Sequence, residues 1–102
     1  MAIKKITIFW RDIPSQILVQ KGRNRQKKML APRFQEAIDR AAMRSGKGGS
    51  DAYINEWRRV TESIGNCPDI EALLILEIKE LEDKYSDDEL LKLIRNHGTT
   101  KV

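Results

Sequence analysis

Guanidinium and ammonium groups near the N-terminal end of the chain have the chemistry best suited to binding another molecule. Residues 1–33 carry nine lysines or arginines and one acid. Four of these cations fall within residues 23–28, whose sequence is RNRQKK. Guanidinium groups bind phosphate and carboxylate through paired, fork-like hydrogen bonds. This stretch therefore predicts contact with an anionic partner, although a solvated loop would have the same composition.

The candidate binding surface includes further arginines on either side of this stretch. Two of them, Arg40 and Arg44, belong to the polar side of a predicted helix. The full set is Arg11, Arg23, Arg25, Lys27, Lys28, Arg33, Arg40, Arg44, Arg58 and Arg59. Trp10 and Trp57 are candidate contact anchors, because tryptophan and arginine dominate binding hot spots. Packing in the core is the simpler explanation of both tryptophans and is favoured over the anchor role.

The balance of charge changes sign along the chain. Residues 34–64 carry five bases and five acids, and residues 65–102 carry five bases and nine acids. This asymmetry has two explanations that stay open. The basic end has an anionic partner, or the two ends neutralise each other within one fold, where charges interact over a Debye length of about 10 Å.

Residues that commonly carry catalysis or bind metals lack suitable neighbours in the sequence. His97 has no cysteine or carboxylate at ligand spacing, so we expect a surface cap at a helix end. Cys67 has no partner histidine or second cysteine, so we expect a structural role. Residues 46–50 (GKGGS) lack the G-x-x-x-x-G-K-[ST] spacing of a phosphate loop and indicate a linker. We therefore predict no catalytic residue, no metal site and no cofactor.

Length and composition predict one domain over residues 1–98, followed by a frayed tail over residues 99–102. No apolar run approaches the roughly 18 residues needed to span a bilayer. The N-terminus lacks the apolar region and cleavage site of a signal peptide. The single cysteine cannot form an internal disulfide. We expect a cytoplasmic protein that does not bind membranes.

A pair of antiparallel strands is predicted before the basic stretch. The alternation over residues 6–10 indicates a strand. Large apolar groups fall on both of its faces, so the strand is expected to be central in its sheet. Asp12 and Pro14 predict a turn, and residues 16–21 predict the returning strand. The polar residues 22–28 are expected to form a loop, with a frayed extension of the returning strand as the alternative. We expect the helices to cover the face formed by Ile6, Ile8, Ile17 and Val19.

Three amphipathic helices are predicted after this hairpin. Residues 32–45 have apolar side chains at i, i+3, i+4 and i+7, with Pro32 in the first turn. Similar spacing predicts helices over residues 68–84 and 87–96. The last of these is expected to begin with a capping box formed by Ser86 and Glu89.

The spacing of apolar residues over 51–61 fits two kinds of structure. Tyr53, Trp57 and Val60 have helical spacing, but alternate residues also fit one side of a strand. A strand over residues 55–62 after a short turn is favoured, because a two-stranded hairpin alone makes a poor sheet. The predicted order is β-β-α-β-α-α, a two-layer α+β sandwich with helices on one face of a small antiparallel sheet.

Three segments resemble the small bacterial virulence factor domain, which is named for the N-terminal part of conserved virulence factor C. They are FWRDIP at residues 9–14, RFQEAIDRAAMR at residues 33–44, and Tyr53 with Trp57-Arg58-Arg59. The resemblance covers about residues 6–60 in the same order. After Gly65 the chain is similar to that domain in helical character only.

The resemblance implies a regulatory or accessory role. The larger named protein has a helical-repeat region, for which this chain has no room, and is associated with regulating virulence genes. Stand-alone members resemble accessory proteins of folate or corrinoid one-carbon enzymes, and the family offers no catalytic residues to carry over. We therefore predict a non-enzymatic module that binds a protein or anionic partner. A nucleic-acid-binding regulator and a small subunit of a folate or corrinoid enzyme remain the alternatives.

Overall fold

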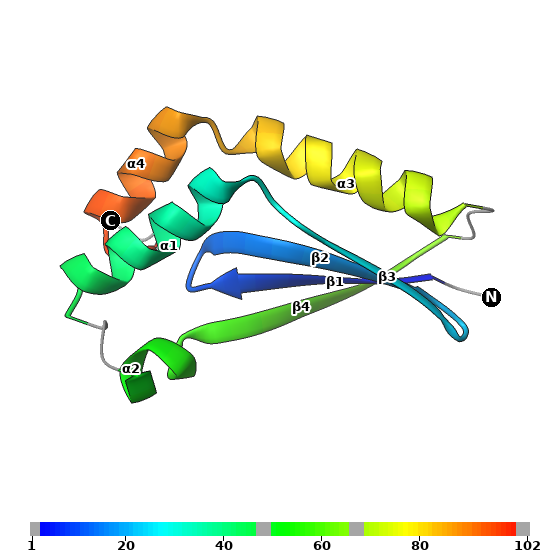
Figure 1. The fold of residues 1–102 in the computed structure, drawn as a ribbon, viewed down its shortest axis with the longest axis horizontal. Coiled ribbons are helices and arrows are strands. Elements are labelled where there is room, and N and C mark those ends of the chain that lie inside the picture. Colours follow the sequence, from blue (N-terminus) through cyan, green and yellow to red (C-terminus); the bar gives the residue numbers. More distant parts are fainter. Residues whose placement is uncertain (1–2, 47–49, 66–68, 100–102) are drawn as a thin grey trace.

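The computed structural model describes residues 3–46, 50–65 and 69–99. Within these residues the chain forms, in order, β1 (Ile3–Trp10), β2 (Ile13–Lys21), β3 (Asn24–Met29), α1 (Pro32–Arg44), α2 (Ser50–Asn55), β4 (Trp57–Ile64), α3 (Ile70–Lys84) and α4 (Asp87–Arg95) (Figure 1). The strands form one antiparallel sheet in the order β3-β2-β1-β4. The predicted α+β class is confirmed, as are the central position of β1 and the three longer helices to within one or two residues at each end.

Strand β3 occupies most of the region predicted as a basic loop. Only Gly22 and Arg23 remain as a turn, and Gly22 has a φ of 61°. All six residues of β3 are exposed, as expected for the edge of a sheet. The favoured loop is wrong for residues 24–28, and the strand alternative is closer, although β3 is a separate strand after a turn. The loop was favoured because β3 has no apolar alternation and forms by pairing with β2. Its charges also hinder further pairing at the free edge.

The ambiguous region around residues 51–61 contains both a helix and a strand. Helix α2 ends at Asn55, and β4 then pairs with β1 from Trp57 to Ile64. The predicted strand is thus confirmed over residues 57–62, but the expected short turn is a helix. With β3 and α2 added, the observed order is β-β-β-α-α-β-α-α instead of the predicted β-β-α-β-α-α.

Strand register decides which face of the sheet the helices cover. Thr7 pairs with Ile17, and these residues and Val19 are buried on the side where α1 and α3 contact β2. Ile6 and Ile8 point to the other side and are half-buried. The predicted covered set is therefore confirmed for Ile17 and Val19 and wrong for Ile6 and Ile8. Apolar groups on both faces of β1 concealed the register, and a shift of one residue exchanges the faces.

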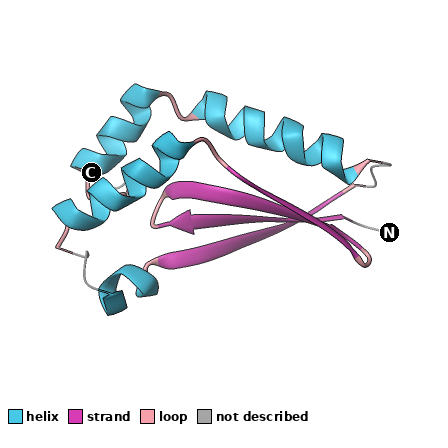
Figure 2. Ribbon diagram, in the orientation of Figure 1, coloured by secondary structure: helices cyan, strands magenta, loops and turns pink. Residues whose placement is uncertain are grey.

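Helices α1, α3 and α4 lie over one side of the sheet (Figure 2). Phe34 and Ile38 from α1 join Leu74 and Ile78 from α3 in the buried core beneath them. Helix α4 starts where the Ser86 side chain accepts a hydrogen bond from the Glu89 amide, which is one half of the predicted capping box. The Glu89 carboxylate pairs with Lys92 at 3.5 Å instead of completing the box. It then packs against α1.

Aromatic rings and a close backbone approach fill the space at the end of β1. Trp10 is fully buried, stacks on Tyr53 at 5.8 Å and donates its Nε1 hydrogen to the Tyr53 carbonyl at 2.9 Å. Gly98 lies against the same indole, since a Cβ there would be 2.9 Å from Trp10 Cζ3. The segment after α4 and helix α2 therefore both pack against Trp10.

Candidate functional site

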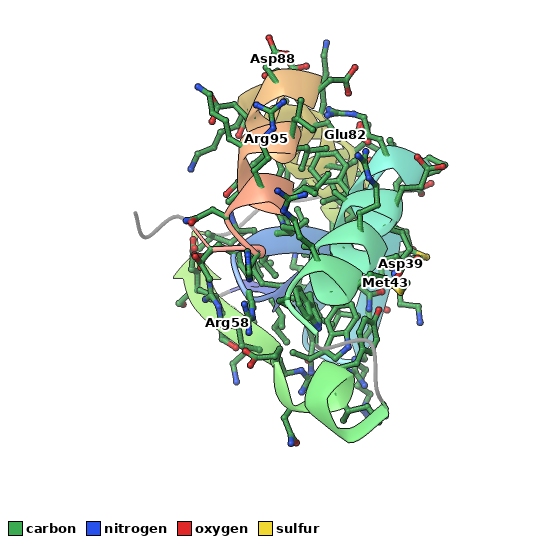
Figure 3. The ribbon with its side chains drawn as sticks, turned by 90° about the vertical axis from the view of Figure 1, so that its left-hand side faces the viewer. Asp39, Met43, Arg58, Glu82, Asp88 and Arg95 are labelled. Atoms are coloured by element: carbon green, nitrogen blue, oxygen red, sulfur yellow. The ribbon has the colours of Figure 1, made fainter. Side chains whose placement is uncertain are left out.

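Two of the predicted binding arginines hold the β1–β2 turn in place. Arg11 donates to the His97 carbonyl at 2.7 Å and pairs with Glu56 at 3.4 Å. Arg58, labelled in Figure 3, donates to the Arg11 carbonyl at 2.8 Å and pairs with Asp12 at 3.0 Å. These guanidinium groups thus have partners within the fold.

A third arginine, Arg33, joins α1 to the corner between α3 and α4. Its guanidinium donates to the carbonyls of Glu82, at 2.8 Å, and Tyr85. It also lies over the Phe34 ring at 4.5 Å and pairs with Asp87 at 3.4 Å. Carbonyls at a helix C-terminus lack partners within the helix, so a cation there satisfies them.

Two further arginines lie on the outer side of α1. Arg40 and Arg44 are exposed, and Met43 beside them is 76% exposed. Asp39 and Met43, which are labelled in Figure 3, are exposed on the same helix. Because α1 lies over the covered side of the sheet, neither arginine belongs to the uncovered side.

Three cross-strand rows make up the uncovered side of the sheet, here called the open face. Paired residues in neighbouring strands point to the same side of a sheet. From β3 to β4, the rows are Arg25, Gln20, Lys4 and Ser63; Lys27, Leu18, Ile6 and Thr61; and Met29, Gln16, Ile8 and Arg59. All twelve are half-buried or exposed, and Figure 1 shows no described helix running along this side.

Apolar side chains occupy the centre of the open face. Ile6, Ile8 and Leu18 belong to the central strands β1 and β2. Ile6 pairs directly with Leu18, so the three form a continuous group. The residues lining a hollow in this surface include Ile8, Gln16, Leu18, Arg25, Lys27 and Arg59.

Positive charge without acidic neighbours accompanies this apolar centre. The cations of the open face are Lys4, Arg25, Lys27 and Arg59, and none of its twelve residues is acidic. None of the four forms an ion pair with another residue in the described part of the chain. By contrast, Glu62 and Glu77 lie on the covered side, where both pair with Lys5.

The remaining predicted residues lie outside the open face. Arg23 is exposed in the β2–β3 turn, and Lys28 pairs with Ile17 and so points to the covered side. Trp57 is half-buried and packs edge-on against Tyr53 at 5.7 Å. The structure thus brings together Arg25, Lys27 and Arg59 from the predicted set.

Sequence reasoning missed Lys4 as a member of this surface. Lys4 alternates with Ile6 and Ile8, so its period-two spacing was a signal that it shares their face. That signal becomes useful only when those isoleucines are known to lie on the uncovered side.

A second hollow lies between α3 and the covered sides of β1 and β4. Its lining includes Lys5, Glu62, Glu77 and Tyr85. Burial opposes the charge of Lys5, but Glu77 at 3.0 Å and Glu62 at 3.6 Å together outweigh it and raise the lysine pKa above its ordinary 10.5. Burial, aided by the Asp12 carboxylate, raises the pKa of Tyr85 above 10.0. The central lysine and glutamates pair with one another, so this hollow is part of the helix–sheet contact.

The residues considered for catalysis form no cluster in the described part of the chain. His97 is exposed just after α4 and has a φ of 61°. Cys67 and residues 47–49 of the linker lie outside the described residues. Within residues 3–46, 50–65 and 69–99, no group of three His, Cys, Asp or Glu side chains could hold a metal ion. Nor is any helix there both long and apolar enough to cross a membrane.

Comparison with known proteins establishes the family. The model of the family described as "Virulence factor" matches residues 8–94. The chain belongs to the virulence factor family. The match runs beyond the motifs at residues 6–60 and takes in α3 and nearly all of α4. Every open-face residue except Lys4 and Ile6 lies within the part matched by the virulence factor family. Comparison with curated proteins and with solved structures gave no significant match.

Proposed function

We propose that this member of the virulence factor family is a non-enzymatic accessory or regulatory module whose open face binds an anionic protein surface. One observation carries the proposal. The chain has 15 acidic residues, yet none is among the twelve residues of the open face, where four cations surround three apolar side chains.

The chemistry of the open face suits a protein partner that carries carboxylates. Arg25 and Arg59 can each bind a carboxylate through two hydrogen bonds. Ile6, Ile8 and Leu18 add apolar area, which an anion alone would leave exposed to water. An apolar centre with a charged margin is the usual anatomy of a protein–protein interface.

Protection of the sheet edges explains only part of this pattern. Lysine and arginine on the edge strand β3 hinder unwanted pairing with other strands. Acidic side chains would repel other chains as well, and Lys4 lies on a central strand that has no free edge. A single sign of charge at both the centre and the margins therefore favours an anionic partner.

Nucleic-acid binding through the same four cations is a second candidate function. Unpaired lysine and arginine groups suit phosphates, and such binding would weaken steeply with salt. The twelve positions of the open face include no aromatic residue, although base stacking on aromatic rings is the usual means of holding single strands. Gel shifts over a salt series test this function, and the absence of any DNA or RNA shift at low salt would exclude it.

Affinity purification from the native host, followed by mass spectrometry, tests the protein-binding function. The baits are the unmodified chain, an Arg25→Ser/Lys27→Ser/Arg59→Ser variant, and a Lys28→Ser/Arg40→Ser/Arg44→Ser variant. The last removes the same charge from exposed positions outside the open face. We expect the open-face variant to lose the partner and the control variant to keep it. A partner retained by the open-face variant, or lost equally from both, would contradict the proposal.

A further inference from the structure

The open face has the dimensions of a site for one helix. Strands β3 and β4 are three strand intervals apart, which corresponds to about 14 Å at the usual strand spacing. An α-helix with its side chains is about 10–12 Å wide. A helix lying over β1 and β2 would therefore have Arg25 and Lys27 along one margin and Arg59 at the other.

The length of the central strands also matches a helix of ordinary size. Strands β1 and β2 have 8 and 9 residues, so they are about 26–30 Å long. A helix of about 18–20 residues has the same length. Apolar residues at i, i+3, i+4 and i+7 would give such a helix a continuous stripe along Ile6, Ile8 and Leu18.

The covered face of the same sheet already binds a helix of this chemical kind. Helix α3 turns Leu74 and Ile78 inward, where they are 3% and 4% exposed. Its acidic Glu77 pairs at 3.0 Å with Lys5 of the central strand β1. Lys4 is the preceding residue of the same strand and points to the open face, so both faces combine an apolar centre with a lysine from β1.

The inference rests on the proposed function and specifies the partner. We infer that the anionic partner docks an acidic amphipathic helix on the open face, with its apolar stripe on Ile6, Ile8 and Leu18 and its carboxylates at the cationic margins. An extended peptide added to the β3 edge would leave the apolar centre exposed. A helix uses the apolar centre and both margins together.

Binding of designed peptides to the full chain tests this inference. The stripe peptide has about 18 residues, enough to favour a helix, with leucines at i, i+3, i+4 and i+7 and glutamates beside them. The control peptide has the same composition with its leucines spread around the helix. Polyglutamate of equal length is the third probe, and fluorescence anisotropy reports each dissociation constant.

We expect the stripe peptide to bind at least about tenfold more tightly than the control peptide and polyglutamate, a difference that Kd measurements resolve easily. Arg25→Ser/Lys27→Ser/Arg59→Ser should weaken all acidic probes. Lys28→Ser/Arg40→Ser/Arg44→Ser should leave their binding within about twofold, because Lys28 points to the covered side of the sheet and the other two belong to the exposed side of α1. Leu18→Gln should weaken the stripe peptide and leave polyglutamate unchanged. Circular dichroism of each variant verifies that it is folded.

The possible outcomes separate the inference from the function on which it rests. Equal binding of the stripe and control peptides would overturn the helix inference and leave anion binding intact. Binding of no acidic probe would overturn both. Tighter binding of a single-stranded oligonucleotide than of the stripe peptide would overturn the helix inference and favour the nucleic-acid function.

Discussion

At the residue scale, Gly98 is a position where the fold leaves no room for a side chain. Its φ is 87°, and a Cβ would lie 2.9 Å from the buried Trp10 ring. We expect Gly98→Ala to lower the free energy of unfolding by about 2–4 kcal/mol, because left-handed strain and overpacking act together. Urea denaturation followed by circular dichroism measures the loss.

Gly46→Ala provides the matched control for that substitution. Gly46 has a similar φ of 75°, but a Cβ there would have no atom within 4 Å. Gly46→Ala should therefore lower the free energy of unfolding only by the backbone strain, about 1–2 kcal/mol. Equal losses for the two variants would contradict the packing of Trp10 against Gly98.

The sequence supplied the identity of the cations but could not supply their partners. Arg11 and Arg33 look no different from Arg25 in a list of basic residues. Their hydrogen bonds to the carbonyls of His97 and Glu82 join segments far apart in the chain. Such contacts depend on the tertiary fold, so composition and spacing could not separate structural arginines from exposed ones.

At the element scale, Arg33 ties α1 to the α3–α4 corner. We expect Arg33→Ala to destabilise the fold by about 1–3 kcal/mol, because the Glu82 and Tyr85 carbonyls lose their donor. Arg40→Ala, on the exposed side of the same helix, should change stability by less than about 0.5 kcal/mol. Denaturation curves of the two variants that coincide would contradict this role.

The stabilisation that the contact between α3 and the sheet provides should be lost at alkaline pH. Both Lys5 and Tyr85 have a pKa raised above the ordinary values of 10.5 and 10.0. A raised native pKa means that the folded state holds its proton more tightly than the unfolded state. Its stabilising contribution is therefore complete below the unfolded pKa and is lost as pH rises through the native pKa.

We accordingly expect the free energy of unfolding to fall as pH rises above about 10, and to fall less steeply in Lys5→Met. Urea denaturation at a series of pH values from neutral to alkaline measures both slopes. Identical slopes in the two proteins would contradict the contribution of the Lys5–Glu77 pair.

Helices were easier to predict than strands for a physical reason. The stripe of Phe34, Ala37, Ile38, Ala41 and Ala42 is buried as its spacing predicts, because a helix forms its hydrogen bonds locally. Strand β3 depends on pairing with β2, and its own residues carry no apolar alternation. The orientation of β1 likewise depends on register with its neighbours.

At the scale of the whole molecule, the charge gradient along the chain becomes an arrangement in space. Acidic residues of the C-terminal part neutralise some N-terminal cations, as in the pairs Lys5–Glu77 and Arg33–Asp87. The cations of the open face have no such partner among the described residues. Part of the N-terminal charge is therefore neutralised within the fold, and part faces outward on the open face.

The most direct test of the open-face proposal is a methyl NMR titration of the full chain with the partner recovered by affinity purification. The account predicts shifts of the Ile6, Ile8 and Leu18 methyl signals, while Ile54 and Leu76, which are 62% and 52% exposed elsewhere, stay unchanged. Shifts confined to Ile54 and Leu76, with the open-face methyls unaffected, would contradict it.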